Sequence, residues 1–395
     1  MDPRLNPYAP GAGTPPPDLV GRDELIERAS IALDRIRAGR AARSLILYGL
    51  RGVGKTVLLN KIRLDAEANG MVSVKVEAPE DRSLPAILAP SLRSALLRIS
   101  RGEALKDNLL TGMRALASFT KALKIKYQDI ECGIDAEPLL GSADSGDLNT
   151  DLSDLLLHIG RAAKERGTAV ILYIDELQYV KEDQLEALIA ALHSTSQDQL
   201  PITMVAAGLP QLLGQMGRAK SYAERLFEFV PIGQLDDAHA RAALEIPAGK
   251  ENVEYEKDAV DAILRETEGY PYFLQEWGKH CWNIAQAPNI RAVDASRATT
   301  DALAELDTSF FRVRFDRLTP AEKRYMRAMA ELGPGPHRSG DIAEILDSTV
   351  SSVAPTRSSL ITKGMIFSPA YGDTAFTVPL FDGYMKRIMP KYEAR

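Results

Sequence analysis

Cysteine is scarce in this chain of 395 residues, which contains only Cys132 and Cys281. The two lie far apart, and neither has a second cysteine or a histidine at the spacing of metal ligands. The sequence therefore predicts neither a disulfide framework nor a zinc site, and we interpret both residues as core or incidental thiols. The five histidines are scattered and form no metal-binding motif.

Long apolar runs are also missing. The longest uninterrupted ones are about as long as residues 169–174, far short of the roughly 18 residues that a membrane-spanning helix needs. The N-terminal segment MDPRLNPYAPGAGTPPPD lacks the apolar stretch of a secretory signal and the Arg/Ser-rich pattern of a transit peptide. We therefore expect a cytoplasmic protein without a membrane segment.

An excess of positive charge is absent as well, since the formal net charge is −6. This balance argues against a protein that coats nucleic acid with its whole surface, and it leaves room for a local basic patch. The length exceeds that of one ordinary domain and predicts two or three. The proportions of hydrophobic and charged residues are those of ordinary globular proteins.

Most of the chain alternates between two kinds of apolar pattern. Residues 1–19 are rich in proline and glycine, which predicts an extended segment on the surface. From residue 20 to residue 233, stretches with helical periodicity separate five short apolar runs: residues 44–48, 72–76, 170–174, 202–207 and 227–231. Because parallel strands require crossover connections, this alternation predicts an α/β domain with a parallel sheet and helices on both faces.

Two smaller domains are predicted after the α/β domain. Residues 235–310 carry only helical patterns and predict a helical lid. Residues 316–395 predict three short helices and then an alternating stretch, Met365 to Val378, with a turn at residues 371–373. This order is typical of a winged helix-turn-helix domain.

A β-hairpin insertion is predicted near residues 121–137. Apolar residues recur there with period two on either side of Gln128-Asp129. One arm carries lysines and the other carries acidic residues, so we interpret the hairpin as a docking site for a protein partner.

The segment from Gly49 to Thr56 has the sequence GLRGVGKT and fits the pattern G-x-x-x-x-G-K-[ST], between a predicted strand and a predicted helix. The glycines let successive backbone N–H groups point at phosphates, and the helix that follows adds the positive end of its dipole. We expect Lys55 to neutralise the β and γ phosphates of ATP, and Thr56 to bind Mg²⁺ through its hydroxyl. The alternative is a glycine-rich turn without a ligand. The predicted nucleotide contacts are Gly49, Gly52, Val53, Gly54, Lys55, Thr56 and Val57.

A second part of the same site is predicted at the end of the buried strand 170–174, where Asp175 and Glu176 follow. We expect Asp175 to hold Mg²⁺ and Glu176 to polarise the water that attacks the γ phosphate. Alone, an apolar strand that ends in two acids is more often a solvated strand end. The phosphate loop upstream favours the catalytic interpretation and predicts an ATPase.

Together these motifs resemble the AAA+ superfamily of P-loop ATPases, and above all its origin-recognition-like and archaeal-type members with their STAND relatives. The resemblance covers about residues 19–390. The segment that begins Val20-Gly21-Arg22 looks like the box that precedes the first helix in these proteins. The resemblance implies that Val20, Gly21 and Arg22 contact the adenine.

The resemblance also has departures. Leu209-Pro210 occupies the sensor-1 position without the usual polar residue, and Gln178 is one candidate to replace it. Gly269-Tyr270-Pro271 resembles the GxP motif in the lid of STAND-type ATPases, which implies that Pro271 packs on the base. No sensor-2 arginine accompanies it, so the lid is expected to respond less tightly to the γ phosphate.

Arg225 lies ahead of the last predicted strand, where members of the superfamily place an arginine finger. The resemblance implies that it reaches the nucleotide of a neighbouring subunit, and hence that the chain forms a homo-oligomer. The alternative is a surface arginine in a salt bridge with a helix neighbour.

The predicted winged domain is basic in an otherwise acidic chain. From Phe310 to the C-terminus there are 13 Lys and Arg residues against 9 Asp and Glu residues. On its third helix, Val350, Val353, Leu360 and Ile361 are expected to pack inward and Ser351, Ser352, Thr356 and Arg357 to face outward, where they could contact DNA. Winged helices also serve as protein contacts, so both kinds of partner stay open.

These patterns predict an ATP-binding and ATP-hydrolysing AAA+ ATPase that acts as a nucleotide-controlled switch or as a DNA-associated initiator or loader. The implied partners are ATP with Mg²⁺, double-stranded DNA through the winged helix, and a protein partner through the hairpin. The alternative is a STAND-like signalling ATPase that assembles with protein partners, for example in defence against mobile DNA, and hydrolyses ATP slowly without binding DNA.

Overall fold

The computed structural model describes residues 1–78, 82–100, 107–124, 126–127 and 136–391. The chain divides into two units. The core unit comprises residues 22–48 and 55–231, and the C-terminal unit comprises residues 1–21, 49–54 and 232–395. Residues 49–54 therefore group with the C-terminal part of the chain, although they connect two elements of the core unit. No helix among the described residues has the length and apolar character to cross a membrane.

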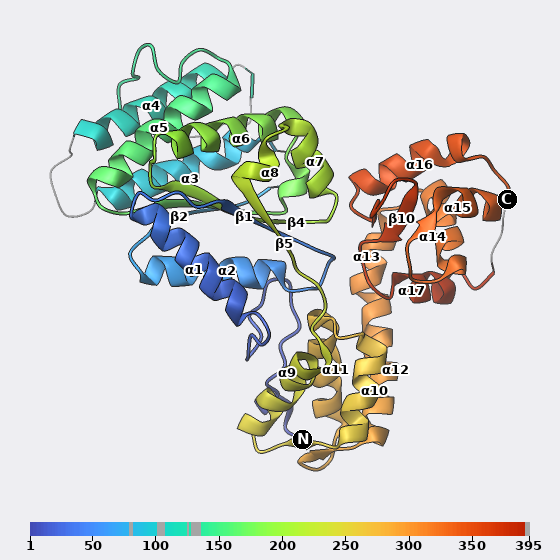
Figure 1. Cartoon of the computed structure of the whole chain (residues 1–395). Coiled ribbons are helices and arrows are strands. Elements are labelled where there is room, and N and C mark those ends of the chain that lie inside the picture. The colour runs from blue at the N-terminus through green and yellow to red at the C-terminus, as the bar shows by residue number, and fades with distance from the viewer. Residues whose placement is uncertain (79–81, 101–106, 125, 128–135, 392–395) are drawn as a thin grey trace. The chain divides into compact units, whose positions relative to one another are not determined.

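A five-stranded parallel sheet forms the centre of the core unit (Figure 1). Its strands are β1 (Ser44–Tyr48), β2 (Val72–Glu77), β3 (Val170–Asp175), β4 (Ile202–Gly208) and β5 (Phe227–Pro231), in the spatial order β2-β3-β4-β1-β5. Every residue of β3 and β4 is buried, as is typical of parallel strands that are covered on both faces. The five predicted strands are confirmed, and no end differs by more than one residue.

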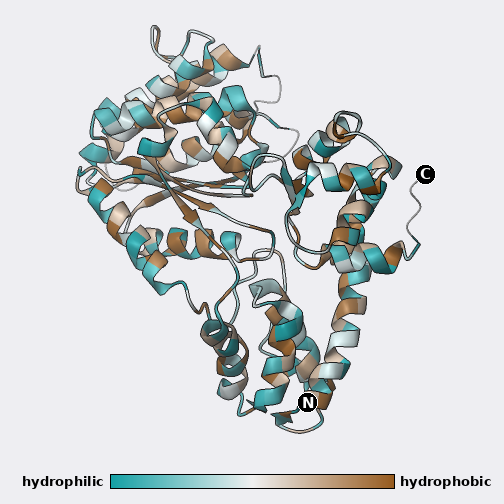
Figure 2. Cartoon of the chain, turned by 45° about the vertical axis from the view of Figure 1, so that its right-hand side comes forward, coloured by the Kyte–Doolittle hydropathy of each residue, from teal (hydrophilic) through white to brown (hydrophobic). Residues whose placement is uncertain are grey.

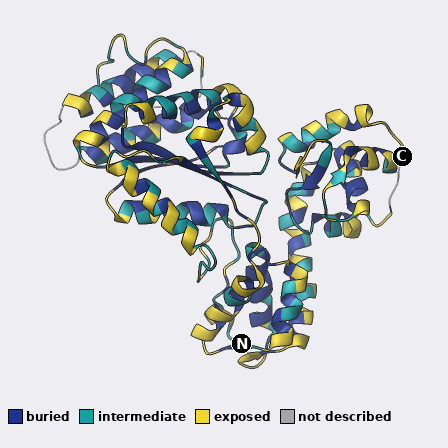
Figure 3. Cartoon of the chain, in the orientation of Figure 1, coloured by how far each residue is buried: buried dark blue, intermediate teal, exposed yellow. Residues whose placement is uncertain are grey.

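Helices cover both faces of this sheet. They are α1 (Asp23–Arg37), α2 (Lys55–Ala68), α3 (Leu84–Ile99), α4 (Asp107–Leu123), α5 (Leu148–Glu165), α6 (Glu182–Gln197), α7 (Leu212–Ala219) and α8 (Ala223–Leu226), with a 3-10 turn η2 (Leu177–Tyr179) after β3. Figure 1 shows α1 and α2 on one face and α3, α5 and α6 on the other. Figure 2 shows hydrophobic and hydrophilic residues interleaved along the helices, and Figure 3 shows buried residues concentrated in the sheet. The α/β fold predicted from the sequence is confirmed.

The first arm of the predicted hairpin at residues 121–137 is wrong where the structure describes it. Lys121 to Leu123 form the end of α4 instead of a strand. Leu116, Phe119 and Leu123 recur at helical spacing and are all fully buried, so the apolar stripe of the helix continues through this segment. Residues 125 and 128–135, including Cys132, lie outside the described residues, and the rest of the hairpin stays a prediction.

The first part of the C-terminal unit is helical. It contains α9 (Asp237–Lys250), α10 (Lys257–Thr267), α11 (Pro271–Ile284), α12 (Ala292–Thr308) and α13 (Phe310–Asp316). A two-residue parallel pair, β6 (Glu254–Tyr255) with β7 (Asn289–Ile290), was not predicted, because two residues are too short to show a periodicity. Cys281 on α11 is fully buried, and burial raises the pKa of its thiol to about 12, which suits an inert core residue.

The remainder of this unit forms the C-terminal module, residues 320–391. Its elements follow in the order α14 (Pro320–Leu332), β8 (His337–Arg338), α15 (Ser339–Ile345), α16 (Val350–Thr362), β9 (Ile366–Phe367), β10 (Asp373–Phe376) and α17 (Phe381–Ile388). The three strands pair antiparallel in the order β8-β10-β9. The three helices and the strand pair after them follow in the predicted order, β8 and α17 were not predicted, and the winged helix-turn-helix stays a prediction. Pro355 lies inside α16, which begins at Val350 with Thr349 as its N-cap.

The N-terminal segment lies on the helices that follow the core unit in sequence. Tyr8 is almost fully buried, and its hydroxyl donates to the carbonyl of Leu244 on α9. A Cβ atom on Gly278 would lie only 2.6 Å from the Tyr8 ring, so glycine is required at this position of α11. The indole N–H of Trp282 donates to the carbonyl of Asp2 at 2.9 Å. These contacts hold the extended segment without regular secondary structure of its own beyond one short turn at Pro3–Leu5.

Candidate nucleotide-binding site

Residues 49–54 form the loop that joins β1 to α2 in the sequence. Gly52 and Gly54 have φ angles of 81° and 90°, which lie in the left-handed region where glycine carries no steric penalty. A Cβ atom on Gly49 would lie 2.0 Å from the carbonyl oxygen of Ile232, so a side chain cannot be accommodated there. Three of the glycines in the motif are thus required by the backbone itself.

Within the C-terminal unit, this loop is hydrogen-bonded to two distant segments. The N–H of Tyr272, the second residue of α11, donates to the carbonyl of Gly52 at 3.1 Å. The N–H of Arg51 donates to the carbonyl of Thr377, just beyond β10, at 2.9 Å. Pro271, expected near the nucleotide, is the first residue of α11 and precedes Tyr272 directly. Neither bond could be predicted from the sequence, because no motif indicates a contact between backbone groups so far apart in the chain.

In the core unit, the first turn of α2 meets the end of β3. The hydroxyl of Thr56 donates to Oδ2 of Asp175 at 2.7 Å. Lys55, the first residue of α2, is also buried, with 8% of its surface exposed. Burial raises the pKa of the Asp175 carboxyl, and the hydrogen bond from Thr56 and the charge of Lys55 oppose that rise. A hydroxyl and a carboxylate at contact distance are the oxygen donors that Mg²⁺ prefers.

Glu176 lies one residue beyond β3 in a strained conformation. Its φ and ψ of 52° and 37° fall in the left-handed region, which is unusual for a residue with a side chain. Its N–H donates to Oδ1 of Asp175 at 2.9 Å. Its carboxylate accepts a hydrogen bond from the side-chain amide of Gln178. Strain of this kind is concentrated at functional sites.

The remaining predicted residues lie in several places. In the core unit, Arg22 is the N-cap residue of α1, and Val57 is half-buried in the first turn of α2. In the C-terminal unit, Val20 precedes Gly21, whose φ is 70° and whose Cβ would lie 2.8 Å from the ring of His239 on α9. Val53 in the loop is buried. These positions are compatible with the predicted adenine and phosphate contacts, which stay predictions.

Arg225 on the short helix α8 is exposed. Its backbone N–H donates to the carbonyl of Tyr222 at 3.0 Å, and its guanidinium forms no ion pair with any described residue. The alternative interpretation, a salt bridge to a helix neighbour, is therefore not what the described residues show. An exposed, unpaired guanidinium suits a contact outside the chain.

The predicted outward face of α16 is partly wrong. Arg357 does not point freely outward, because its guanidinium donates to Thr374 Oγ1 at 2.9 Å and to Ser368 Oγ and the Asp373 carbonyl at 3.0 Å each. Val350, expected inside, is half-exposed at 50%. Helical periodicity alone could not reveal that the strands β9 and β10 cover one side of the helix and bind its arginine.

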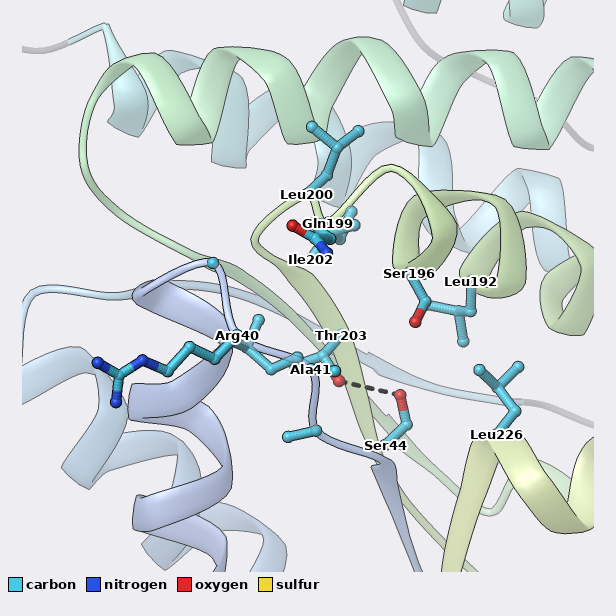
Figure 4. Close-up of a pocket in the computed structure, with 13 residues that line it drawn as sticks. Arg40, Ala41, Ser44, Leu192, Ser196, Gln199, Leu200, Ile202, Thr203 and Leu226 are labelled. Carbon is cyan, nitrogen blue, oxygen red and sulfur yellow. Dashed lines mark hydrogen bonds between the residues drawn. The ribbon is translucent and has the colours of Figure 1, made fainter.

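A small cavity lies in the core unit at the amino ends of β1 and β4 (Figure 4). The hydroxyls of Ser44, the first residue of β1, and Thr203, the second residue of β4, are 2.9 Å apart at its edge. Its volume of about 20 Å³ can hold a water molecule but no nucleotide. In parallel sheets ligands bind at the carboxyl ends of the strands, where Asp175 lies, so this cavity is not the functional site.

Two family models match the chain. Residues 18–205 match the family described as the AAA ATPase domain, and residues 308–385 match a domain of unknown function, DUF8462. The chain is also 22% identical over 381 residues to an uncharacterised HTH-type transcriptional regulator of Methanocaldococcus jannaschii, with coverage of 91% of this chain and 86% of the relative.

Three solved structures with a similar course of the chain are the following. The Aeropyrum pernix ORC1 protein in complex with DNA is 14% identical with a TM-score of 0.48, and covers 94% of this chain and 93% of its own. Cdc6p of Pyrobaculum aerophilum is 12% identical with a TM-score of 0.46 and coverage of 99% and 98%. The Thermotoga maritima RuvB Holliday junction branch migration motor is 15% identical with a TM-score of 0.44 and coverage of 90% and 92%. Residues 18–205, which contain the phosphate-loop motif and strands β1 to β3 of the parallel sheet, are therefore identified as an AAA ATPase domain.

Proposed function

We propose that the chain binds ATP with Mg²⁺, hydrolyses it, and uses the nucleotide to control the contacts of its C-terminal module. The contact that carries this proposal is the 2.7 Å hydrogen bond between Thr56 and Asp175, because it joins the end of the phosphate-loop motif to the acidic end of β3. Lys55 and Glu176 each lie one residue from this pair. The match of residues 18–205 to the AAA ATPase domain supports the same chemistry.

Each residue has a defined task in this mechanism. Lys55 and the backbone N–H groups of the loop bind the phosphates. Thr56 and Asp175 fit Mg²⁺ as oxygen ligands, and the bound ion would neutralise charge on the β and γ phosphates. Glu176 accepts a proton from water as the water oxygen bonds to the γ phosphorus. The bond from that phosphorus to the bridging oxygen breaks, ADP leaves with the electron pair, and the proton returns to the phosphate product.

The hydrogen bonds of residues 49–54 support a switch. Gly52 accepts from Tyr272 on α11, and Arg51 donates to Thr377 in the C-terminal module. A phosphate that draws the loop N–H groups toward itself competes with the bond from Arg51 to Thr377. The hydrogen bond between Arg51 and Thr377 therefore couples nucleotide binding at the loop to the C-terminal module, which we propose as the part that contacts the partner.

The positions of the cations in the C-terminal module favour a protein partner over DNA. Among the described residues of α16, the single cation is Arg357, and its guanidinium is already bound by the strands of the same module. Lys363, at the end of the helix, is paired with Glu322 at 2.7 Å. A recognition helix that binds DNA needs cations or amides directed at phosphates and base edges. We infer a nucleotide-controlled switch of the STAND-like kind, which acts in the cytoplasm through a protein partner.

Action on DNA is the second candidate. The relative in Methanocaldococcus jannaschii is named as an HTH-type transcriptional regulator, and the C-terminal module has the element order of a winged helix-turn-helix. In this case the contact would come from the end of α13 and from α14 and α17, which carry the exposed cations Arg317, Arg324 and Lys386. An origin-recognition-like initiator or loader would act in this way.

The deciding experiment measures ATP turnover by the purified chain, with and without double-stranded DNA, across a salt series. The proposed switch predicts Mg²⁺-dependent ATP binding and slow turnover that DNA leaves unchanged. Stimulation by DNA that weakens as salt rises would instead support the initiator or loader, because counterion release makes DNA binding depend on salt. Failure to bind ATP with Mg²⁺ would refute both.

A further inference from the structure

A buried amide links the ends of two neighbouring strands of the core unit, β3 and β4. Gln178 lies in η2, directly after β3, with only 4% of its surface exposed. Its Nε2 donates to the Glu176 carboxylate, and its Oε1 accepts from the N–H of Leu209, just beyond β4, at 3.0 Å. The side chain therefore connects the acid after β3 to the backbone after β4.

The surrounding residues allow the Gln178 side chain only one conformation. A Cβ atom on Gly208 would lie 2.8 Å from Gln178 Oε1, so the absence of a side chain at Gly208 makes room for the amide. The side-chain amide of Gln215 on α7 donates to the backbone carbonyl of Gln178 at 3.2 Å. Leu209 itself is fully buried. A side chain packed this closely, with both ends of its amide bound, is held in a single rotamer.

The two bonds require the chemistry of glutamine. An amide offers a donor and an acceptor on one neutral group, whereas glutamate offers only acceptors and would place a second negative charge against Glu176. Methionine has a similar length and shape and makes neither bond. Asparagine is one methylene shorter, so it cannot span the same two partners from the same backbone position.

The geometry points to Gln178 as a positioning residue for ATP hydrolysis. Its amide fixes the position of the Glu176 carboxylate relative to the end of β4. This inference rests on the proposed function of Glu176 as the group that polarises water. The left-handed turn at Glu176 directs its backbone, and the amide of Gln178 directs its side chain. The residue after β4 is the apolar Leu209. Its backbone N–H donates to Gln178, and Gln178 in turn donates to the Glu176 carboxylate.

The consequence is a separation between binding and chemistry. Gln178 contacts the Glu176 side chain and not the Thr56 to Asp175 pair, so its loss is expected to spare Mg²⁺-ATP binding. A carboxylate that is free to swing spends less time at the attacking water, and misplacement of a catalytic group by about 1 Å costs up to a hundredfold in rate.

The test compares Gln178→Met with Gln215→Met in the full chain by single-turnover hydrolysis and by ATP-binding calorimetry. We expect Gln178→Met to lower the rate constant of hydrolysis by about tenfold to a hundredfold with an ATP affinity within about twofold of the native chain. Gln215→Met removes a neighbouring amide that binds only the backbone of Gln178, so its rate should stay near native. Thermal unfolding of both variants reports any general loss of structure.

Each outcome decides the matter. A native rate in Gln178→Met, alongside a Glu176→Gln variant that is inactive, would overturn the positioning role and leave the proposed function standing. If Gln178→Met loses rate and ATP affinity to the same extent, the role of Gln178 is structural and the positioning role is overturned. The same conclusion follows if Gln178→Met and Gln215→Met lose the same amount of rate. An inactive native chain would refute the proposed function itself. A selective loss of rate in Gln178→Met supports the inference.

Discussion

The hydroxyl of Thr56 lies 2.7 Å from the carboxylate of Asp175 and donates a hydrogen bond to it. The two residues are far apart in the sequence, and the parallel sheet brings them together because β3 ends beside the start of α2. The pair places a neutral oxygen and an acidic oxygen at the point where Lys55 begins the helix.

The Thr56 hydroxyl should matter for ATP only when Mg²⁺ is present. Thr56→Val preserves the shape of the side chain and removes the oxygen that we assign to the ion. We expect the affinity for ATP with Mg²⁺ to fall by about tenfold to a hundredfold, the range of one polar contact with a charged group. Affinity without Mg²⁺ should change little. Calorimetric titration with and without Mg²⁺ measures both, and Thr56→Ser is the control that keeps the hydroxyl.

Glu176 and Lys55 should separate turnover from binding. Glu176→Gln keeps the size of the side chain and removes its basicity, so ATP binding should persist while turnover falls by about a hundredfold or more. Lys55→Ala removes the charge that neutralises the phosphates and should abolish ATP binding. Steady-state hydrolysis and calorimetry distinguish the two variants. Full activity in Glu176→Gln would reject its role as the base, and unchanged affinity in Lys55→Ala would reject the phosphate site.

Arg225 is expected to act across an interface between two copies of the chain. It is exposed, and no described residue pairs with its guanidinium. Arg225→Ala should lose turnover while ATP binding is retained. Mixed with Lys55→Ala protein, it should regain part of that turnover, because the second variant supplies the arginine to the nucleotide of the first.

A nearby arginine provides the matched control for this experiment. Arg218 on α7 is also exposed, but it pairs with Glu182 at 3.3 Å within the same unit. Arg218→Ala should therefore leave turnover near native. Absence of rescue in the mixture, together with a loss of turnover in Arg225→Ala, would place the arginine's action inside one chain.

The sheet and the glycine loop after β1 were predictable because both depend on local sequence. Each buried strand is a short apolar run, and the loop between β1 and α2 carries glycines whose positive φ angles few other residues adopt. Asp175 was predictable from its place at the end of such a run. In each case a few neighbouring residues suffice to specify the backbone.

The errors and omissions concern contacts between distant segments. The lysines and apolar residues at 121–123 alternate as a strand would, yet the buried stripe through Phe119 and Leu123 continues α4. Arg357 has the spacing of an outward residue on α16, but its guanidinium donates hydrogen bonds to residues of β10. The bond between Arg51 and Thr377 joins backbone groups, so no choice of side chain records it. Such features follow from tertiary packing, which overrides local pattern.

Glu322 should make the stability of the C-terminal module depend on pH. Its carboxylate caps α14 by accepting from the N–H of Thr319, and it binds Lys363 and Ser359, all at 2.7 Å. Burial opposes ionisation of this carboxyl, but these hydrogen bonds outweigh it and lower its pKa from 4.5 to about 2. A depressed pKa means that the folded chain binds this proton less readily than the unfolded chain.

The stabilisation is therefore fully present above about pH 4.5, and it is lost as the pH falls through the interval from about 4.5 to about 2. The shift in the pKa of Glu322 corresponds to about 3 kcal/mol of stability at neutral pH.

Glu322→Gln keeps the size and part of the hydrogen bonding but loses the charge, so it should unfold more easily than the native chain at pH 7. Urea unfolding of both proteins at pH 7 and at pH 3 measures the difference. We expect the gap to narrow at pH 3, because Glu322 is then largely protonated in the unfolded state but still mostly ionised in the folded state, so that much of its stabilisation is lost. A gap of the same size at both pH values would show that the charge of Glu322 contributes nothing.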